Sequence, residues 1–434
     1  MWILLLSGCI FYGCWDWRFL ILLFFTSGVD FLSAQKIGES ENQKAKKTWL
    51  IASVLINLII LGFFKYYHFF AESFIDLLNI FGFHPSFTTL KIILPVGISF
   101  YTFQSIAYVT DVYRGKIKPE RSALHYFAFI CFFPQMVAGP IERAKKLLPQ
   151  FKKEKQFSFL YFETGINLIL YGFFKKIVIA DNLALIVDEL HADPQDHGPE
   201  ILFLGMIAFA IQIYTDFSGY SDIARGTAQL LGFKLSKNFY FPYFSTSLKQ
   251  FWSRWHISLS TWFRDYVYIS LGGNKISKFK RNINLLITFI ASGFWHGANF
   301  TFILWGFFHG LGLIGEKSLN KIRLPKVLSG VLVFLFVAVL FTLFRAASFY
   351  DFVNYMQLLL SFNNTSGIGV IHLITGKLFF IIPFLLFVLF EISKYNKKGL
   401  SKYKYNMIGN FLILIAILLF SVFENAPSFI YFQF

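Results

Sequence analysis

Residues 283–315 read INLLITFIASGFWHGANFTFILWGFFHGLGLIG and contain no lysine, arginine, aspartate or glutamate. A bilayer core needs about 20 apolar residues per helical span, so this stretch is too long for one span and too short for two. Arg281 and Lys317 flank it, and cations favour the cytoplasmic side of a membrane. We therefore expect the chain to turn within the membrane or to cross it obliquely. The residues near the expected turn are Gly293, His296, Gly297 and Asn299.

The composition extends this conclusion to the whole chain. Hydrophobic residues make up 56% of the 434 residues and charged residues 15%, whereas about 25% of the residues in soluble domains are charged. Segments 49–70, 327–344 and 378–390 are nearly free of charge and approach or reach the length of a span. The sequence predicts an all-α, polytopic integral membrane protein.

The net charge of +16 is better explained by a membrane than by nucleic acid. The cations gather in short loops between apolar runs, as expected beside the anionic lipids of a cytoplasmic face. We predict that no nucleic acid binds, and that the acidic segment 181–200 is an external loop. The basic loops expected in the cytoplasm are 36–47, 143–155, 317–326 and 394–404.

A second apolar run, 126–139, is flanked by cations on both sides and is too short to cross twice. It ends in Phe133-Pro134-Gln135 and Gly139-Pro140, which break helices and favour turns. We predict that this segment re-enters without crossing. Irregular backbone survives at membrane depth only inside protein or beside a water-filled cavity, so the run indicates an interior polar chamber.

Residues 251–266 are predicted to form an amphipathic helix. At about 100° per residue, the aromatic and leucine side chains from Phe251 to Tyr266 share one face, and Arg254 and Asp265 lie opposite. We expect this helix to lie along the cytoplasmic interface. His256 falls at the edge of the aromatic face and could point into the protein beside Trp252.

Of nine histidines, His296 is the strongest candidate for chemistry, because an ionisable group in mid-membrane is costly unless it faces a cavity. The alternative is a neutral imidazole that packs and bonds to a neighbouring carbonyl or hydroxyl. For His309, packing and chemistry are equally good interpretations. A desolvated, neutral histidine suits general-base catalysis of hydroxyl attack on an acyl thioester.

Competing catalytic motifs are missing from the sequence. It has no Gly-x-Ser-x-Gly elbow, no phosphate-binding Gly-x-x-x-x-Gly-Lys loop and no His-Glu-x-x-His zinc helix. The three cysteines lack metal-type spacing and form no convincing disulfide pair. We therefore expect no bound metal and no bound cofactor.

Five segments occur in a recognisable order: LPVGISFYTFQ at 94–104, FPQMVAGPI at 133–141, DFSGYSDIA at 216–224, FWSRWHISLSTWFRDY at 251–266 and GFWHGA at 293–298. Together they resemble the membrane-bound O-acyltransferase superfamily, in its bacterial alginate O-acetyltransferase branch. The resemblance covers about residues 90–315. It implies a barrel of tilted helices around a tunnel, with a catalytic core at 90–315 between membrane segments at 1–89 and 316–434.

The resemblance also implies roles for individual residues. The family's invariant histidine falls on His296 and its second site position on His256, where many members of the superfamily have asparagine. We expect both to be catalytic. Arg254 is alternatively interpreted as fixing the amphipathic segment, as are Asp265 and Asp216. The residues expected to contact substrate are Trp295, Asn299, Gln135, Trp255 and Arg254.

The implied reaction transfers an acetyl group from acetyl-CoA or another cytosolic thioester toward a cell-envelope polysaccharide such as alginate or peptidoglycan. The implied location is the bacterial inner membrane, with lipid and an extracytoplasmic acetyltransferase as partners. Two alternatives stay open, namely a D-alanyl transferase of the same superfamily and a transporter or flippase without acyl chemistry. Relatives usually carry a further hydrophobic segment before the part that matches residues 1–18.

Overall fold

The computed structural model describes residues 1–84, 90, 92–137, 139–319, 324–361, 378–396, 407–423, 427, 429 and 430. Within these residues every regular element is a helix, which confirms the predicted fold class. Four of the helices in the described residues are long and apolar enough to span a membrane. The chain forms two compact units, residues 1–156 with 232–236 and residues 157–231 with 237–434. The predicted basic loops at 317–326 and 394–404 lie partly outside the described residues.

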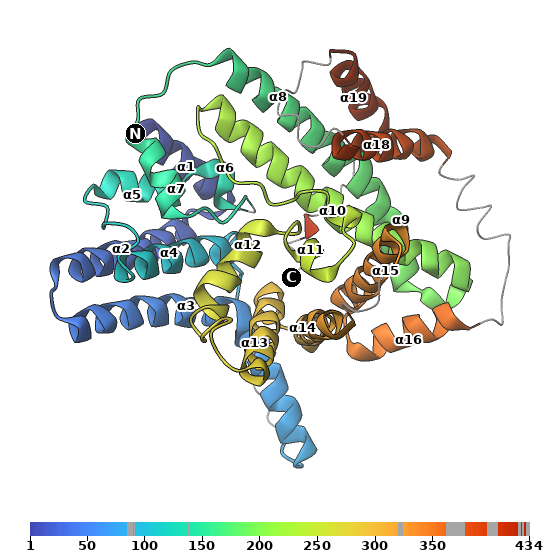
Figure 1. Ribbon diagram of the computed structural model, residues 1–434, viewed down its shortest axis with the longest axis horizontal. Helices are drawn as coiled ribbons and strands as arrows, with labels where there is room; N and C mark the ends of the chain where they lie inside the picture. Colours follow the sequence, from blue (N-terminus) through green and yellow to red (C-terminus); the bar gives the residue numbers. More distant parts are fainter. Residues whose placement is uncertain are drawn as a thin grey trace. The chain divides into compact units, whose positions relative to one another are not determined.

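The first unit is a set of helices of very unequal length. Three of its helices, α2, α3 and α4, pack against one another, as Figure 1 shows for the blue to cyan part of the chain. The helices of this unit are α1 (Trp2–Asp16), α2 (Arg18–Glu39), α3 (Gln43–Ile80), α4 (Ile98–Tyr113), α5 (Ala123–Ile130), α6 (Phe133–Met136) and α7 (Ala144–Phe151).

The break predicted in the run 126–139 is present. Helix α5 has 8 residues and α6 has 4, so neither reaches the length of a span. Gly97, before α4, has φ 75°, and a Cβ there would lie 2.4 Å from the carbonyl oxygen of Met136. Only glycine adopts this backbone and admits so close an approach without strain. The glycine therefore lets the irregular segment pack tightly against the start of α4.

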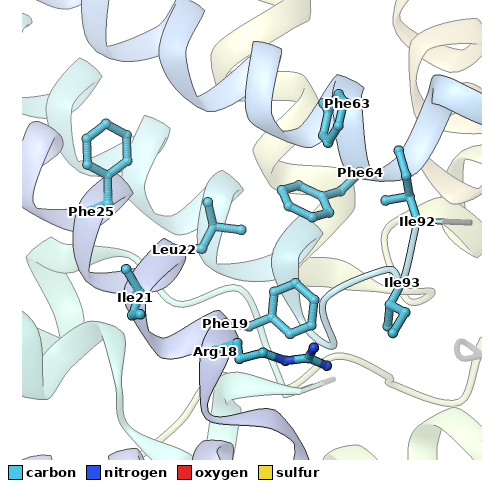
Figure 2. Close-up of a pocket in the computed structure, with 9 residues that line it drawn as sticks. All are labelled: Arg18, Phe19, Ile21, Leu22, Phe25, Phe63, Phe64, Ile92 and Ile93. Atoms are coloured by element: carbon cyan, nitrogen blue, oxygen red, sulfur yellow. The ribbon is translucent and has the colours of Figure 1, made fainter. Parts of the chain in front are cut away.

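An apolar groove lies on the first unit, with a volume of about 610 Å³. Figure 2 shows phenylalanine, leucine and isoleucine side chains from α2, α3 and the segment before α4 around it, with Arg18 at one end. Arg18 forms an ion pair with Asp16, since the Nη2 atom of Arg18 lies 2.6 Å from the Asp16 carboxylate. The groove carries no titratable group other than Arg18, so we do not place chemistry there.

The second unit holds the remaining helices. Segment 181–200, predicted as a loop, instead contains a helix of 12 residues, α9. Its elements are α8 (Phe159–Phe173), η1 (Phe174–Ala180), α9 (Asp181–Ala192), η2 (Pro194–Asp196), α10 (Pro199–Leu230), η3 (Pro242–Phe244), α11 (Leu248–Trp252), α12 (Ile257–Trp262), η4 (Phe263–Tyr268), α13 (Lys278–His296), α14 (Phe300–Leu319), α15 (Lys326–Arg345), α16 (Phe349–Leu360), α18 (Leu378–Asn396) and α19 (Met407–Phe420).

Helices α8 and α10 run side by side through a seam of glycines (Figure 1). A Cβ on Gly172 would lie 2.7 Å from the carbonyl oxygen of Gly219, and a Cβ on Gly165 would lie 3.0 Å from that of Gly226. Small residues let membrane helices approach closely and gain van der Waals contact. The seam sets the position of α10, which carries the DFSGYSDIA segment.

Helices α13 and α14 form a hairpin, also side by side in Figure 1. A Cβ on Gly293 would lie 2.1 Å from the carbonyl oxygen of Phe302, and one on Gly306 would lie 2.2 Å from that of Phe289. The turn at 297–299 falls where the apolar stretch predicted it. The hairpin brings the end of α13 against the start of α14.

The prediction of one continuous amphipathic helix at 251–266 is wrong about its continuity, because the three short elements α11, α12 and η4 cover this range. Helix α11 ends at Trp252, a turn follows, and α12 begins only at Ile257. His256 has φ 40°, in the left-handed region, which interrupts the helix. The apolar face is nevertheless buried at Phe251, Trp255 and Leu259. Periodicity identified the buried face and missed the backbone break.

Candidate active site

His296 is the last residue of α13, and 6% of its surface is exposed. Its ring centroid lies 4.9 Å from that of Trp295, 5.3 Å from that of Trp305 and 5.3 Å from that of Phe344. The imidazole therefore sits among aromatic rings contributed by α13, α14 and α15. The ring is therefore largely shielded from water by its aromatic neighbours.

The turn after His296 is fixed by side chains as well as by backbone. The amide Oδ1 of Asn299 accepts a hydrogen bond from the backbone N–H of Thr301 (3.0 Å), which caps the start of α14. Its Nδ2 donates to the carbonyl oxygen of Ala347 (2.7 Å). A Cβ on Gly297 would lie 2.1 Å from the ring of Phe302. Asn299, predicted to contact substrate, thus also holds the turn next to His296.

His256 lies close to Trp295, the residue before His296. It is 1% exposed, and its ring centroid is 4.6 Å from that of Phe217 and 6.2 Å from that of Trp295. Burial lowers the pKa of His256 to about 3. The prediction that this side chain could point into the protein is confirmed, although its neighbours are Phe217 and Trp295 rather than Trp252. Both candidate histidines contact Trp295, so one indole lies beside both.

Asn238 holds the backbone around His256 in place. Its carbonyl oxygen accepts a hydrogen bond from Ile257 N–H (2.9 Å) and its Oδ1 accepts one from the Ser258 hydroxyl (2.6 Å). The carbonyl oxygen of His256 accepts the first helical bond of α12, from Ser260 (2.9 Å). These bonds maintain the left-handed conformation, which costs a non-glycine residue about 1 kcal/mol or more.

His309 is fully buried next to the same aromatic cluster. Its ring centroid lies 4.7 Å from that of Trp305 and 4.9 Å from that of Trp252. Neither of its ring nitrogens makes a hydrogen bond to the residues that the structure describes. Trp305 contacts both His309 and His296. His309 is therefore close to the candidate site and shares Trp305 with it.

A network of charged residues lies on the other side of α10, and the sequence did not reveal it. Lys175 Nζ lies 2.7 Å from the Asp222 carboxylate and donates to the Ser218 hydroxyl (3.0 Å). Lys176 Nζ lies 2.6 Å from the Asp181 carboxylate and 2.9 Å from that of Asp216. The two lysines occur in a π-helical segment, η1, a rare geometry that inserts a residue into a helix.

The same network extends to α18. The Glu391 carboxylate accepts hydrogen bonds from the hydroxyls of Tyr171 (2.7 Å) and Tyr214 (2.9 Å). Asp216 also accepts one from the backbone N–H of Ile430 (2.8 Å). Asp216 was predicted to fix the amphipathic segment, and this prediction is wrong. Its hydrogen bonds and ion pair join α10 to η1 and to the C-terminal part of the chain. Two adjacent lysines at the end of an apolar run were the signal that could have indicated buried acidic partners.

The other predicted contact residues lie in three different places. Trp255 is 3% exposed and stacks on Phe251, with ring centroids 5.5 Å apart. Arg254 donates to the carbonyl oxygen of Phe244 (3.3 Å), which supports its interpretation as a structural residue. Gln135 belongs to the first unit, where its Nε2 donates to the carbonyl oxygen of Phe129 (2.9 Å). Of the five, Trp295 is the one that touches both histidines.

No group of histidine, cysteine, aspartate and glutamate residues in the described part of the chain is arranged to hold a metal ion. The cysteine thiols of Cys9, Cys14 and Cys131 are free.

Comparison with known proteins gives one family and a consistent group of relatives. Residues 116–323 match the membrane-bound O-acyltransferase family. The chain is 40% identical over 348 residues to a probable alginate O-acetylase of Pseudomonas aeruginosa, covering 79% of this chain and 66% of that protein. It is 32% identical over 402 residues to a peptidoglycan O-acetyltransferase of Helicobacter pylori, covering 85% of this chain and 75% of that protein.

A third relative is more distant. A teichoic acid D-alanyltransferase of Streptococcus thermophilus is 31% identical over 250 residues, which cover 52% of this chain and 60% of that protein. The chain spans about two thirds of the length of the Pseudomonas protein. The matched family region contains His256 and His296, and its C-terminal boundary lies just beyond α14.

Proposed function

The chain belongs to the membrane-bound O-acyltransferase family, and we propose that it transfers an acetyl group from a cytosolic thioester to hydroxyl groups of a cell-envelope polysaccharide. Two relatives that match most of the chain act, by their names, on alginate and on peptidoglycan. Both acceptors present sugar hydroxyls outside the cytoplasm. We infer a location in the inner membrane and a tunnel that lets donor and acceptor meet.

One observation carries the proposal, namely His296 at the end of α13, buried among aromatic rings and next to a rigid turn. A neutral imidazole in such a site can accept a proton from a hydroxyl. The hydroxyl oxygen then attacks the thioester carbonyl carbon, and a C–O bond forms as the C–S bond breaks. The leaving thiolate takes the proton from the imidazolium, so the histidine is neutral again at the end of the reaction.

We assign His256 to the placement of donor or acceptor. It stays uncharged because burial lowers its pKa to about 3, and an uncharged imidazole can both donate and accept a hydrogen bond. Trp295 separates it from His296 and contacts both rings. In this proposal the two histidines approach a substrate from two directions, and the Trp295 indole lies beside both imidazole rings.

A D-alanyl transfer is the second candidate, since one relative bears that activity in its name. That match covers 52% of this chain at 31% identity, against 79% at 40% for the alginate O-acetylase. The acetyl reading is favoured for this reason. We further propose acetyl-CoA as the first donor to test and an extracytoplasmic acetyltransferase as the partner that completes the transfer.

The deciding experiment measures ester-linked acetate on envelope polysaccharides. A strain lacking the protein is complemented with wild type, His296→Ala, His256→Ala or the control His84→Ala, an exposed histidine on the first unit. We expect wild type and His84→Ala to restore acetate and His296→Ala to restore none at equal membrane abundance. Unchanged acetate in the deletion strain would overturn the acetyl assignment, and altered ester-linked alanine would instead support the second candidate.

Whether His296 acts as a base or as a transient acyl carrier is a separate question. Membranes containing the protein, incubated with radiolabelled acetyl-CoA and no acceptor, distinguish the two roles. Proton abstraction predicts no label on the protein. Label that is present in wild type and absent in His296→Ala would assign a covalent acyl-imidazole and contradict the mechanism above.

A further inference from the structure

The apolar groove of the first unit ends at a pair of opposite charges. Its volume of about 610 Å³ lies within the range of about 300–1,000 Å³ that is usual for small-molecule sites. Among the described residues that line it, Arg18 is the only charged one, and it forms an ion pair with Asp16. The other lining side chains are phenylalanine, leucine and isoleucine (Figure 2). The groove therefore suits a ligand with a long apolar part and one polar end.

The tryptophans on either side of Asp16 place the charged end at the level of the lipid headgroups. Trp15 and Trp17 are exposed at the junction of α1 and α2, and tryptophan is enriched where a membrane meets water. Helix α2, which begins at Arg18, has the length and composition of a membrane span. It rises by about 10 Å from Arg18 to Phe25. The groove therefore extends from the headgroup level into the hydrocarbon of the bilayer.

Aromatic contacts hold the headgroup end of the groove in place. The ring of Trp15 stacks on that of Phe19 with centroids 5.1 Å apart, and Phe19 contacts Phe64 of α3 at 5.9 Å. Further along α2, the lining side chains of Ile21 and Phe25 are exposed at 66% and 57%. Because α2 is long enough to cross the apolar core of a membrane, these exposed side chains meet acyl chains. The groove is therefore open to lipid along its length.

The carboxylate of Asp16 fixes the guanidinium of Arg18 at the end of the groove. Arg18 Nε donates to Asp16 Oδ1 (3.0 Å), and Nη2 donates to Oδ2 (2.6 Å). Nη1 makes no hydrogen bond to the part of the chain that the structure describes. The Arg18 side chain is 63% exposed, against 14% for Asp16. The guanidinium therefore keeps N–H groups for a phosphate, to which arginine makes strong, charge-assisted hydrogen bonds.

The two opposite charges discriminate between classes of lipid. An anionic phospholipid or a fatty acid would bring its negative charge close to Asp16 as well as to Arg18, and the pair has no net charge to attract it. A zwitterionic headgroup carries both a phosphate and an ammonium, so it complements both members of the pair. We propose that the groove binds one zwitterionic phospholipid, with an acyl chain between α2 and α3, its phosphate on Arg18 and its ammonium near Asp16.

The test is native mass spectrometry of the purified chain in detergent, because this measurement counts bound lipids one at a time. The protein is offered equal amounts of phosphatidylethanolamine and phosphatidylglycerol with the same acyl chains. Wild type should retain one phosphatidylethanolamine and prefer it at least several-fold over phosphatidylglycerol. Asp16→Asn removes the negative charge and leaves that of Arg18 uncompensated, so the preference should shift several-fold toward phosphatidylglycerol.

Two matched substitutions on α2 test the groove itself. Leu22→Trp fills the groove and should lower the retention of both lipids several-fold, whereas Leu32→Trp, at an exposed leucine outside the groove lining, should not. If Leu22→Trp does not accumulate, Ile21→Trp replaces it, because Ile21 lines the groove and is exposed. The charge control is Glu39→Gln, since Glu39 pairs with Lys36 at the other end of the same helix, and it should keep the preference of wild type.

Three results would overturn the proposal. The first is a wild-type protein that retains the two lipids equally or prefers phosphatidylglycerol. The second is equal lipid retention by the groove-filling variant and Leu32→Trp. The third is a dimer of wild type that the groove-filling variant abolishes, which would assign the groove to a second copy of the chain.

Discussion

Two regions of the second unit share helix α10 and differ in chemistry. On one side, His256, His296 and His309 lie among aromatic rings. On the other side, Lys175 and Lys176 each pair with aspartates. Adjacent residues of α10 divide the two, because Asp216 binds Lys176 while Phe217 contacts His256.

The difference separates buried imidazoles in an aromatic surrounding from charged groups that pair with one another. A carboxylate near His256 would favour the imidazolium form, which cannot accept a proton. The charged groups are instead paired with one another where they hold helices together. We therefore expect substitutions in the aromatic region to change activity with little effect on stability, and substitutions in the charged region to do the reverse.

The largest effect on activity should come from His296→Gln. Glutamine keeps a polar side chain of similar reach but cannot act as a base, and general-base catalysis contributes about 10²–10⁴-fold. We expect the acetyl transfer rate of isolated membranes to fall by about that factor while the thermal midpoint stays near that of wild type. An acetyl transfer rate in His296→Gln similar to that of wild type would show that the aromatic region does not carry the catalytic base.

The largest effect on stability should come from Lys176→Met. Removing this cation leaves the carboxylates of Asp181 and Asp216 buried without compensation, and breaking a buried pair costs about 3–5 kcal/mol. We expect a marked fall in the thermal midpoint and in membrane abundance. Replacing both aspartates by asparagine in the same variant should recover part of the loss, and a failure to recover any would argue against charge compensation as the cause.

A smaller loss of stability is expected for Gly219→Ala in the seam between α8 and α10. The new Cβ would lie 2.8 Å from the carbonyl oxygen of Gly172, and overpacking of this kind costs about 1–3 kcal/mol. Gly62→Ala is the matched control, since a Cβ there meets nothing within 4 Å. Equal midpoints for the two variants would show that the seam relaxes easily.

The smallest expected effect is on the pH dependence of stability. It tests whether His256 in the aromatic region is uncharged. The pKa of His256 in the folded protein is about 3, below its ordinary value of 6.5. Between these values the unfolded chain binds a proton that the folded protein does not, so the histidine lowers stability as pH falls below 6.5. At pH 5.5 the loss is about 1 kcal/mol. His256→Asn should therefore have a flatter midpoint-versus-pH curve than wild type between pH 7 and 5, and parallel curves would contradict the burial argument.

The sequence predicted features that depend on local pattern. An apolar stretch with glycines at its centre located the hairpin of α13 and α14, and mid-membrane placement singled out His296. The break at His256 was missed because an aromatic face with helical periodicity continues through it. The pairs that Lys175 forms with Asp222 and Lys176 with Asp216 were missed because these aspartates follow more than a helix later, and the packing of η1 on α10 brings them together.

The left-handed backbone of His256 has a consequence for how this position can change over generations. Asparagine is among the few non-glycine residues that adopt this conformation readily, and codons for histidine and asparagine differ by a single base. A lineage can therefore pass between these two residues in one mutational step without rebuilding the turn. Most other substitutions would have to overcome the backbone first, so the geometry narrows the routes by which the chemistry of this site can diversify.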